Sequence, residues 1–325
     1  MGERLLNDGG SPLVSAVVIT WNSGEHLRRC LQALQRQTLG RRELIVVDNA
    51  SIDDSVRIAE EHGARILRND ANLGFAAAAN QGIAAAGGAF VQLLNPDCFP
   101  EPDYCELLVR ELDRAGGEYG MATGKLLSAE DPSRVDSKGI RMSRSGRHFD
   151  IDQGEPDHAG PGGPGEVFGV SGAAAMYRRA FLDDVAVAGE VFDADFFSYR
   201  EDADLSWRGR LYGWRALYVP AAVAHHVRRV TPERRRRLPP LINMHSVKNR
   251  FLLRLKNEGA WLALRNAPFE LARDLVTLAA VMTVERTSIP ALTWLWRNRR
   301  RVAAKRRLIQ ERRKVSDREL ARWFR

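Results

Sequence analysis

The segment FFSYREDADLSWR places three carboxylates directly after a group of aromatic side chains. Glu201, Asp202 and Asp204 lie within four positions of one another. Aromatic rings exclude water from a nearby carboxylate, which raises its pKa and suits it to act as a general base. The same acids would also stabilise the N-terminus of a helix that runs to Tyr212 and ends at Gly213. This segment alone is consistent with both interpretations.

A further carboxylate follows the apolar run in LLNPDC. Asp97 comes directly after Asn95 and Pro96, which favour a turn. A carboxylate in such a turn can bind a divalent cation through one oxygen, while water and a diphosphate complete the octahedral shell that Mg²⁺ prefers. A solvated turn without any ligand would have the same sequence.

A sheet has to position these residues, because the N-terminal part of the chain alternates between predicted strands and helices. Strands are expected at 15–20, 43–48, 64–69 and 90–97, and helices at 23–37 and 53–63. This alternation predicts an α/β fold with a Rossmann-like, mostly parallel central sheet flanked by helices.

Polar residues follow the predicted strands at their carboxyl ends. In parallel sheets ligands bind at this edge, so we expect these side chains to lie close together. The residues that end the strands are Thr20-Trp21-Asn22, Asp48-Asn49, Asn69 and Asn95-Pro96-Asp97. Asp48, in VVDNAS, is either a turn former or a carboxylate that accepts hydrogen bonds from a nucleobase or ribose.

The alanine-rich segment NLGFAAAANQG also has two interpretations. Asn72, Gly74, Asn80 and Gly82 recur at a spacing that suits close approach of the backbone to a phosphate or sugar. An alanine-rich helix that packs closely against a strand needs no ligand and would have the same pattern.

The chain is predicted to divide into three parts. Residues 1–12 are expected to be a flexible N-terminus, 13–255 the α/β domain, and 256–325 a basic, Trp-containing helical extension. Within the domain, residues 143–167 are rich in Gly, Pro and Asp, which predicts a long irregular loop.

Composition narrows the class of protein. The 325 residues are 44% hydrophobic and 28% charged, as in an ordinary soluble globular protein. Three cysteines match no disulfide framework or zinc spacing, and we expect neither a signal peptide nor a membrane-spanning helix. TWNSGEH, after the first strand, lacks both the G-x-G-x-x-G of nicotinamide enzymes and the basic phosphate loop of a sugar nucleotidylyltransferase.

The order of the motifs resembles that of a known family. VVITWNSGEHLRRCLQAL, ELIVVDNASIDDS, NLGFAAAANQG, LLNPD, VSGAAAMYRR, FFSYREDADLSWR and GWRALYVPAAVAHH are similar to the motifs of family 2 glycosyltransferases with the GT-A fold. Within that family the chain most resembles the bacterial rhamnosyltransferase-like branch. The resemblance covers about residues 13–255.

The resemblance implies roles for particular residues. Asp202, with Glu201 beside it, corresponds to the general base that acts on the acceptor hydroxyl. Asp97 and His225 correspond to the ligands of a divalent cation, Mn²⁺ or Mg²⁺, and of the adjacent histidines His225 fits the pattern better than His226. The usual Asp-X-Asp metal motif is Asn95-Pro96-Asp97 in this chain, which leaves one carboxylate fewer for the metal.

The implied reaction is metal-dependent transfer of a sugar with inversion, from a nucleoside diphosphate to a hydroxyl. The resemblance suggests dTDP-rhamnose as donor and a polyprenyl-linked or polysaccharide acceptor in cell-envelope glycan synthesis. The residues expected to bind the nucleotide sugar are Thr20, Asn22, Asp48, Asn49, Asn72, Gly74, Asn80, Asn95, Gly172, Ala173 and Arg250. Arg228, Arg229 and the run Lys248-Asn249-Arg250 either help to hold the diphosphate or belong to a solvated basic loop.

The net charge of +8 comes from the C-terminal extension. Residues 256–325 hold 17 Lys and Arg against 7 Asp and Glu, and they include Trp294 and Trp296. Trp beside cationic residues is typical of helices that lie on anionic membranes, which predicts a cytoplasmic protein held peripherally at the inner face of the cell membrane. A helical cap packed on the domain is the alternative, and no nucleic-acid-binding motif is present.

Two other functions share parts of this sequence pattern. A catalytically degenerate GT-A domain could act as a scaffold at the membrane surface. The presence of Asp97, Asp202 and His225 together argues against this, because a scaffold has no use for all three. A sugar nucleotidylyltransferase shares the early strand–helix–strand order but needs the phosphate loop that is missing here.

Overall fold

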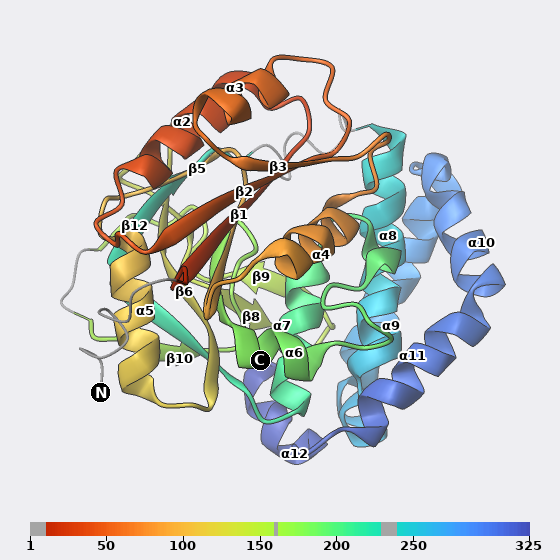
Figure 1. The fold of residues 1–325 in the computed structure, drawn as a ribbon. Coiled ribbons are helices and arrows are strands. Elements are labelled where there is room, and N and C mark those ends of the chain that lie inside the picture. Colours follow the sequence, from red (N-terminus) through yellow and green to blue (C-terminus); the bar gives the residue numbers. More distant parts are fainter. Residues whose placement is uncertain (1–10, 159–161, 229–238) are drawn as a thin grey trace.

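The computed structural model describes residues 11–158, 162–228 and 239–325. Residues 1–10, most of the predicted flexible N-terminus, lie outside the described residues, as does Arg229. The chain forms an α/β fold around one mixed sheet, in the strand order β10-β12-β6-β11-β4-β1-β2-β3 (Figure 1). The predicted α/β class is confirmed.

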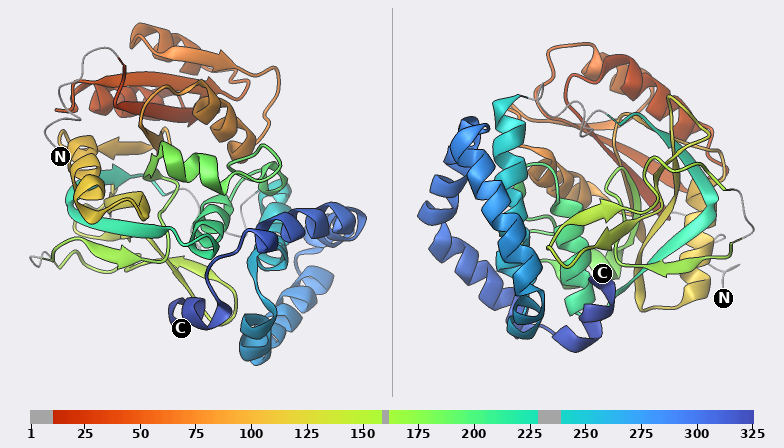
Figure 2. Two further views of the ribbon diagram at one scale, coloured as in Figure 1. Left: turned by 60° about the horizontal axis from the view of Figure 1, so that its bottom comes forward. Right: turned by 180° about the vertical axis from the view of Figure 1, so that it is seen from behind.

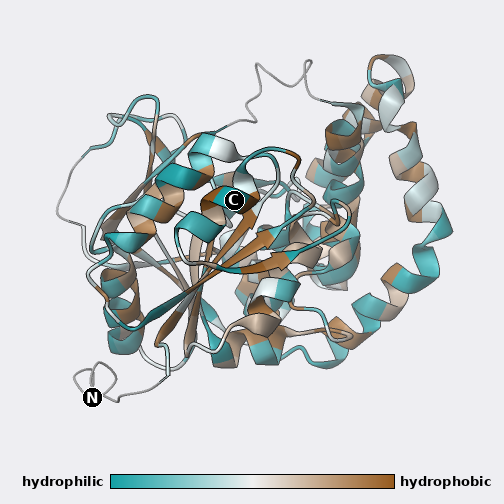
Figure 3. Ribbon diagram, turned by 45° about the horizontal axis from the view of Figure 1, so that its top comes forward, coloured by the Kyte–Doolittle hydropathy of each residue, from teal (hydrophilic) through white to brown (hydrophobic). Residues whose placement is uncertain are grey.

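The N-terminal half of the sheet is parallel. Its strands are β1 (Val14–Thr20), β2 (Arg42–Asp48), β3 (Arg65–Arg68) and β4 (Phe90–Leu94). β1 pairs with β2 on one side and with β4 on the other, so that Thr20 lies opposite Asp48. The predicted strands are therefore confirmed, and their carboxyl ends share one edge. Hydrophobic residues gather along these central strands (Figure 3).

Helices cover both faces of this half of the sheet. They are α2 (Gly24–Gln35), α3 (Ser55–Glu61), α4 (Phe75–Ala85) and α5 (Tyr104–Ala115). Val14, Ala16 and Val18 share a core cluster with α2, α3 and α5, whereas Val17 and Ile19 share the other cluster with α4. This division follows from the alternation of side chains along a strand.

The second half of the sheet contains antiparallel pairs. Its strands are β5 (Cys98–Pro100), β6 (Tyr119–Ser128), β7 (Val135–Ser137), β10 (Gly165–Val167), β11 (Ala174–Arg178) and β12 (Arg215–His226). β11 runs antiparallel between β4 and β6, and β12 pairs with both β6 and β5. Near its end, β12 places His226 opposite Cys98 and therefore close to Asp97.

The prediction of an irregular loop at 143–167 is wrong in part. β8 (Ile140–Met142) and β9 (His148–Asp150) form a separate two-stranded antiparallel sheet, and β10 begins at Gly165. The turn between β8 and β9 contains Gly146, whose φ of 68° favours glycine. The described Gly, Pro and Asp residues of this segment lie largely outside its strands. The strands are three residues long, too short to give an apolar pattern in the sequence.

The C-terminal helices lie along one side of the molecule (Figure 2). The helices of this half are α6 (Arg179–Val185), α7 (Glu201–Leu211), α8 (Pro240–Asn257), α9 (Ala260–Thr283), α10 (Ile289–Arg297), α11 (Arg299–Glu311) and α12 (Asp317–Leu320). Three 3₁₀ turns accompany them: η1 (Ala194–Phe196), η3 (Arg286–Ser288) and η4 (Ala321–Trp323). α8 packs against α7, η1, α10 and α11, so the extension is joined to the α/β domain.

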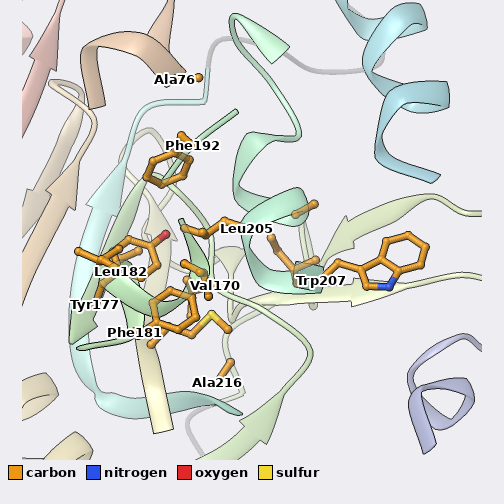
Figure 4. Close-up of a cluster of buried hydrophobic side chains, with 14 of the residues drawn as sticks. Ala76, Val170, Tyr177, Phe181, Leu182, Phe192, Leu205, Trp207 and Ala216 are labelled. Atoms are coloured by element: carbon orange, nitrogen blue, oxygen red, sulfur yellow. The ribbon is translucent and has the colours of Figure 1, made fainter. Parts of the chain in front are cut away.

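The extension is docked by apolar and ionic contacts. Phe324, near the C-terminus, is buried with its ring centroid 4.9 Å from that of Trp207 on α7. Trp207 belongs to the core cluster that includes Tyr177 and Phe181 (Figure 4). Lys305 on α11 lies 2.6 Å from a carboxylate oxygen of Asp193. The helical cap that the sequence offered as an alternative is therefore present.

No single helix in the described parts of the chain is long and apolar enough to cross a membrane. The segments Ala260–Thr283 and Arg286–Arg297 meet that criterion only as a pair, and they are bent by 108° at the break between them.

Candidate active site

Hydrogen bonds join the polar residues at the carboxyl ends of β1 and β2. The backbone N–H of Asn49 donates to the carbonyl of Thr20 at 2.9 Å, and the Asn49 side chain donates to the carbonyl of Gly74 at 3.2 Å. The Asn22 side chain accepts from the N–H of Ile52 at 2.8 Å. These predicted residues share one edge of the sheet, as expected.

Asp48 has the structural role that the sequence left open. Its carboxylate accepts a hydrogen bond from the N–H of Ser51, with distances of 3.2 and 3.3 Å to the two oxygens, and it is buried. The hydroxyl of neighbouring Thr20 is buried without a hydrogen-bond partner among the described residues. Contact of this edge with a nucleotide stays a prediction.

The small residues around α4 serve packing. A Cβ on Gly74 would lie 2.5 Å from the Phe197 ring, and a Cβ on Gly82 would lie 2.3 Å from Val17. The Asn72 side chain accepts from the N–H of Gly74 at 2.9 Å. Close approach here is therefore between parts of the protein, as the packing interpretation requires.

Asn80 does not reach the predicted ligand site. Its amide donates to the carbonyl of Phe192 at 2.7 Å and accepts from the N–H of Phe192 at 2.8 Å. Both ends of the side chain are thereby engaged with the loop that precedes η1. The assignment of Asn80 to nucleotide-sugar binding is corrected to a loop anchor.

A cavity of about 650 Å³ lies between the sheet edge, the β8–β9 hairpin and helices α7, α8 and α9. Six residues expected to have a functional role line it: Asn95, Asp97, Gly172, Ala173, Glu201 and Asp202. The residues that end β1 and β2 do not line this cavity. The tertiary structure thus brings together motifs that are more than a hundred residues apart.

Asp202 is held at the cavity by two backbone donors. The N–H of Gly172 lies 3.0 Å from one carboxylate oxygen, and the N–H of Ala203 lies 2.7 Å from the other. Burial raises the pKa of Asp202, and the charge of Asp150 adds to this effect, although the hydrogen bond from Gly172 opposes it. A carboxylate with a raised pKa and access to a cavity is suited to accept a proton.

Glu201 has fewer hydrogen-bond partners than Asp202 among the described residues. It is buried, and its Oε2 has no hydrogen-bond partner in the described structure. Burial, followed by the charge of Asp202, raises the pKa of Glu201 well above its usual value. The pair therefore shares a site in which at least one carboxyl resists ionisation.

The loop that directly precedes Glu201 and Asp202 has an unusual backbone conformation. Phe197, Tyr199 and Arg200 have positive φ values of 65°, 71° and 72°. Non-glycine residues are strained in this region and adopt it only where surrounding contacts enforce it. Asn249 on α8 supplies such contacts, because its Nδ2 lies 2.9, 2.8 and 2.7 Å from the carbonyl oxygens of Phe196, Ser198 and Tyr199.

Arg250 and Lys248 are engaged away from the predicted diphosphate position. Arg250 is buried, lies 3.4 Å from Asp274 on α9 and does not line the cavity. Lys248 donates to the backbone carbonyl of Asp195 and lies 2.9 Å from the His245 ring. The assignment of Arg250 to the nucleotide sugar is thus corrected to a link between α8 and α9.

The structure also corrects the choice between the two adjacent histidines. Side chains alternate along β12, so only one of the pair can face the cavity. His226 Nε2 lies 3.5 Å from Asp97 Oδ1, whereas His225 lies on the other side, 2.9 Å from Glu101. The histidine beside the acidic motif is therefore His226, and His225 is not at the site.

The donors around His226 have the chemistry of a metal site. Two ligands of one ion, each at about 2.1 Å, are roughly 3.0–3.5 Å apart, so the spacing of Asp97 and His226 fits a shared cation. The other ring nitrogen of His226 lies 2.8 Å from Asp136, an arrangement typical of metal-binding histidines. The described residues contain no group of three or more side chains able to hold a metal.

The protonation of His226 follows from the same contacts. Burial lowers its pKa, but the carboxylates of Asp136 and Asp97 outweigh burial and raise the pKa to about 9. Arg228 in turn holds Asp136 at 2.6 Å and Asp150 at 2.7 Å. The predicted proximity of Arg228 to the site is observed, with the guanidinium engaged by these two acids.

Several cavity residues were not predicted from the sequence. They are Arg147, His148 and Asp150 on the hairpin, Arg200 before α7, and Arg273 on α9. Arg200 lies 3.1 Å from His148, and burial together with Arg200, Arg147 and Arg228 lowers the pKa of His148 well below its usual value. No motif in the sequence signals the three-dimensional grouping of these residues.

Comparison with known proteins agrees with this architecture. The family model "Glycosyl transferase family 2" matches residues 15–186. The chain is 30% identical over 242 residues to the N-acetylglucosaminyl-diphospho-decaprenol L-rhamnosyltransferase of Mycobacterium tuberculosis, covering 66% of this chain and 76% of that protein.

Solved structures of low sequence identity share the fold. GalNAc-T7, solved with UDP, GalNAc and Mn²⁺, has a TM-score of 0.60 at 15% identity, covering 77% of this chain but 48% of that chain. The mannosyltransferase PcManGT from Pyrobaculum calidifontis, in complex with GDP-Man and Mn²⁺, has a TM-score of 0.54 at 17% identity, covering 94% and 90%. The chain therefore belongs to glycosyl transferase family 2 and is a glycosyltransferase with the GT-A fold.

Proposed function

We propose that the protein transfers L-rhamnose from dTDP-rhamnose, with inversion, to a hydroxyl of a lipid-linked or polysaccharide acceptor in cell-envelope glycan synthesis. The mycobacterial relative, whose name specifies L-rhamnose and a diphospho-decaprenol acceptor, supports this choice of donor and acceptor. The single observation that carries the proposal is that Asp202 and the Asp97–His226 pair line the same cavity.

In the proposed mechanism Asp202 acts as the general base. Its carboxylate takes the proton of the acceptor hydroxyl while that oxygen forms a bond to the anomeric carbon of the donor sugar. The bond from the anomeric carbon to the phosphate oxygen breaks, and the nucleoside diphosphate leaves with the electron pair. One displacement from the face opposite the leaving group inverts the configuration.

Asp97 and His226 are the residues that would hold a divalent cation, Mn²⁺ or Mg²⁺. When bound, such a cation neutralises the charge that develops on the departing diphosphate. Asp136 keeps the His226 ring oriented through its hydrogen bond at 2.8 Å. A cation held by these two residues would have positions left for diphosphate oxygens and water, as is usual where Mg²⁺ binds with a substrate phosphate.

The outer face of α9 supports a peripheral position on the cytoplasmic face of an anionic membrane. Leu264, Leu271, Leu275 and Met282 are 77%, 62%, 68% and 59% exposed. At 100° per residue these four side chains fall within about 40° of one another around the helix, so they form one stripe. We call these four residues the α9 stripe. The cationic residues of the extension would attract anionic lipids around it.

The first test is thermal stabilisation by UDP, dTDP, GDP and CDP, each with and without Mn²⁺ or Mg²⁺. A ligand that binds only the native state raises the unfolding midpoint according to its concentration relative to Kd. We expect a metal-dependent rise with dTDP that is lost in Asp97→Ala and kept in Asp202→Asn.

Transfer from dTDP-rhamnose to a synthetic N-acetylglucosaminyl-diphospho-lipid then tests the reaction itself. We expect Asp202→Asn to lower kcat about 10²–10⁴-fold, the contribution typical of a general base. If the protein is stabilised more by another nucleoside diphosphate than by dTDP, dTDP-rhamnose is not the donor. Absence of any nucleotide-dependent stabilisation would favour a catalytically degenerate scaffold.

A further inference from the structure

α9 separates two chemically different surfaces. Arg273 lines the cavity, whereas the α9 stripe faces away from the domain. At 100° per residue Arg273 is about 180° from Leu264 around the helix, on the same side as buried Leu262 and Asn266. A helix about 10 Å thick thus stands between a cationic cavity wall and an exposed apolar face.

Arg273 is available to bind a ligand. Its Nε is buried without a hydrogen-bond partner, and no ion pair joins its guanidinium to another residue within 11–158, 162–228 or 239–325. Neighbouring Arg250 and Arg254 share the carboxylate of Asp274, at 3.4 and 2.5 Å. An arginine that is partly desolvated and unmatched by a carboxylate favours an anionic ligand.

The β8–β9 hairpin adds further cations to the same cavity. Arg147 lines it and stacks on Phe149, with the guanidinium carbon 4.5 Å from the ring centroid. Arg200 also lines it and contacts His148. The hairpin turn touches α9, because Arg144 donates to the carbonyl of Arg265 at 3.1 Å. These contacts fix the hairpin and α9 as adjoining walls of the cavity.

We propose that Arg273, together with Arg147, binds the diphosphate of a prenyl-linked acceptor that reaches the cavity over α9. This inference rests on the proposed function and names how its acceptor is recognised. A diphosphate at the membrane surface could enter the cavity while its prenyl chain remains in the lipid beside the α9 stripe. The donor diphosphate would occupy the separate position beside Asp97 and His226.

The test is a calorimetric titration of the full chain with farnesyl diphosphate, farnesol and inorganic pyrophosphate. dTDP and excess Mg²⁺ are present, so that the donor position is filled. We expect farnesyl diphosphate to bind and farnesol to bind at least about tenfold more weakly, because an ionic contact to phosphate is lost. In Arg273→Gln and in Arg147→Gln, the Kd for farnesyl diphosphate should rise about tenfold, with dTDP binding unchanged.

Arg307→Gln is the matched control, because the exposed Arg307 side chain on α11 pairs only with nearby Glu311 among the described residues. It changes the same charge and should leave all three Kd values unchanged. The unfolding midpoint of each variant checks that it is folded.

Three results would overturn the proposal. Unchanged binding of farnesyl diphosphate in Arg273→Gln would show that the Arg273 guanidinium does not bind the diphosphate. Equal weakening of dTDP would assign Arg273 to the donor. Pyrophosphate that binds as tightly as farnesyl diphosphate would indicate a site for a free anion. If dTDP fails to bind the unaltered protein, the donor proposal fails, while the prenyl diphosphate titration can still be measured.

Discussion

At the scale of single residues, the site combines carboxyl groups whose environments differ. Asp202 faces backbone donors, whereas Glu201 is buried with one oxygen unpartnered. Asp97 faces His226. Burial raises the pKa values of Asp202 and Glu201 above that of an ordinary surface acid, and the charge of Asp202 adds to the rise at Glu201. A carboxylate with a raised pKa is a stronger base.

The pH dependence of transfer tests the role of Asp202. A base must be ionised, so kcat should fall as the pH falls through the apparent pKa of the Glu201–Asp202 pair. Because burial raises both pKa values, this midpoint should lie above the ordinary aspartate value of 3.8. A rate profile with its midpoint at or below that value would contradict the assignment.

Glu201 should reduce the stability of the fold at neutral pH. A carboxyl group whose pKa is raised on folding stabilises the native state below its unfolded pKa, and this contribution is lost as pH rises through the folded pKa. Glu201→Gln should therefore unfold at a temperature roughly 1–3 °C higher at pH 8, with the difference shrinking toward pH 4. Thermal unfolding at several pH values checks this, with exposed Glu25→Gln as the control.

At the scale of elements, α8 fixes the loop that precedes α7. Asn249 links one helix of the C-terminal half to three carbonyls in a segment with positive φ values. Lys256, on the same helix, also contacts α7, because its Nζ lies 3.0 Å from a carboxylate oxygen of Asp204. The position of Glu201 and Asp202 therefore depends on α8, a helix that lies at the end of the predicted α/β domain of residues 13–255.

Replacing Asn249 tests this dependence. Asn249→Ala removes the donor shared by three carbonyls, which should cost about 1–3 kcal/mol of stability and let the acids move. We expect kcat to fall about ten- to hundredfold, since small displacements of catalytic groups have effects of this size. Nucleotide-induced stabilisation should persist, because Asn249 does not line the cavity.

Asn266→Ala on α9 is the matched control, since Asn266 is also buried but its amide nitrogen has no partner among the described residues. An equal loss of kcat in both variants would indicate general destabilisation. Unchanged kcat in Asn249→Ala would show that the loop keeps its conformation without this contact.

At the scale of the whole molecule, the C-terminal extension has two faces. Its inner face packs on the α/β domain, where Phe324 contacts Trp207, Lys305 pairs with Asp193, and α10 and α11 contact α8. The α9 stripe is exposed, and so are Arg299, Arg300 and Arg307 on α11. Part of the basic surplus is used in docking, since Lys305 and Arg301 pair with Asp193 and Asp195.

Binding to lipid vesicles tests the outer face. Leu275→Ser should weaken binding to phosphatidylglycerol vesicles about three- to tenfold, because burial of a leucine side chain in lipid is lost. Ile52→Ser, at a residue 94% exposed between β2 and α3, is the matched control and should have no effect. Co-sedimentation measures both variants, and equal vesicle binding by Leu275→Ser and the unaltered protein would reject the α9 stripe as a membrane contact.

The sequence by itself determined the parallel half of the sheet, the place of Asp97 in the turn after β4, and the family. Periodic apolar runs specify strands and helices locally, and strand ends of a parallel sheet meet at one edge whatever the details of packing. It did not determine which of His225 and His226 faces the cavity, because one residue of register in β12 reverses the side chain. The contacts of Asn80, Asn249 and Arg250, and the place of Arg273 on the cavity wall, were decided only by the tertiary structure. Each depends on how distant segments pack together, which nothing in the local sequence encodes.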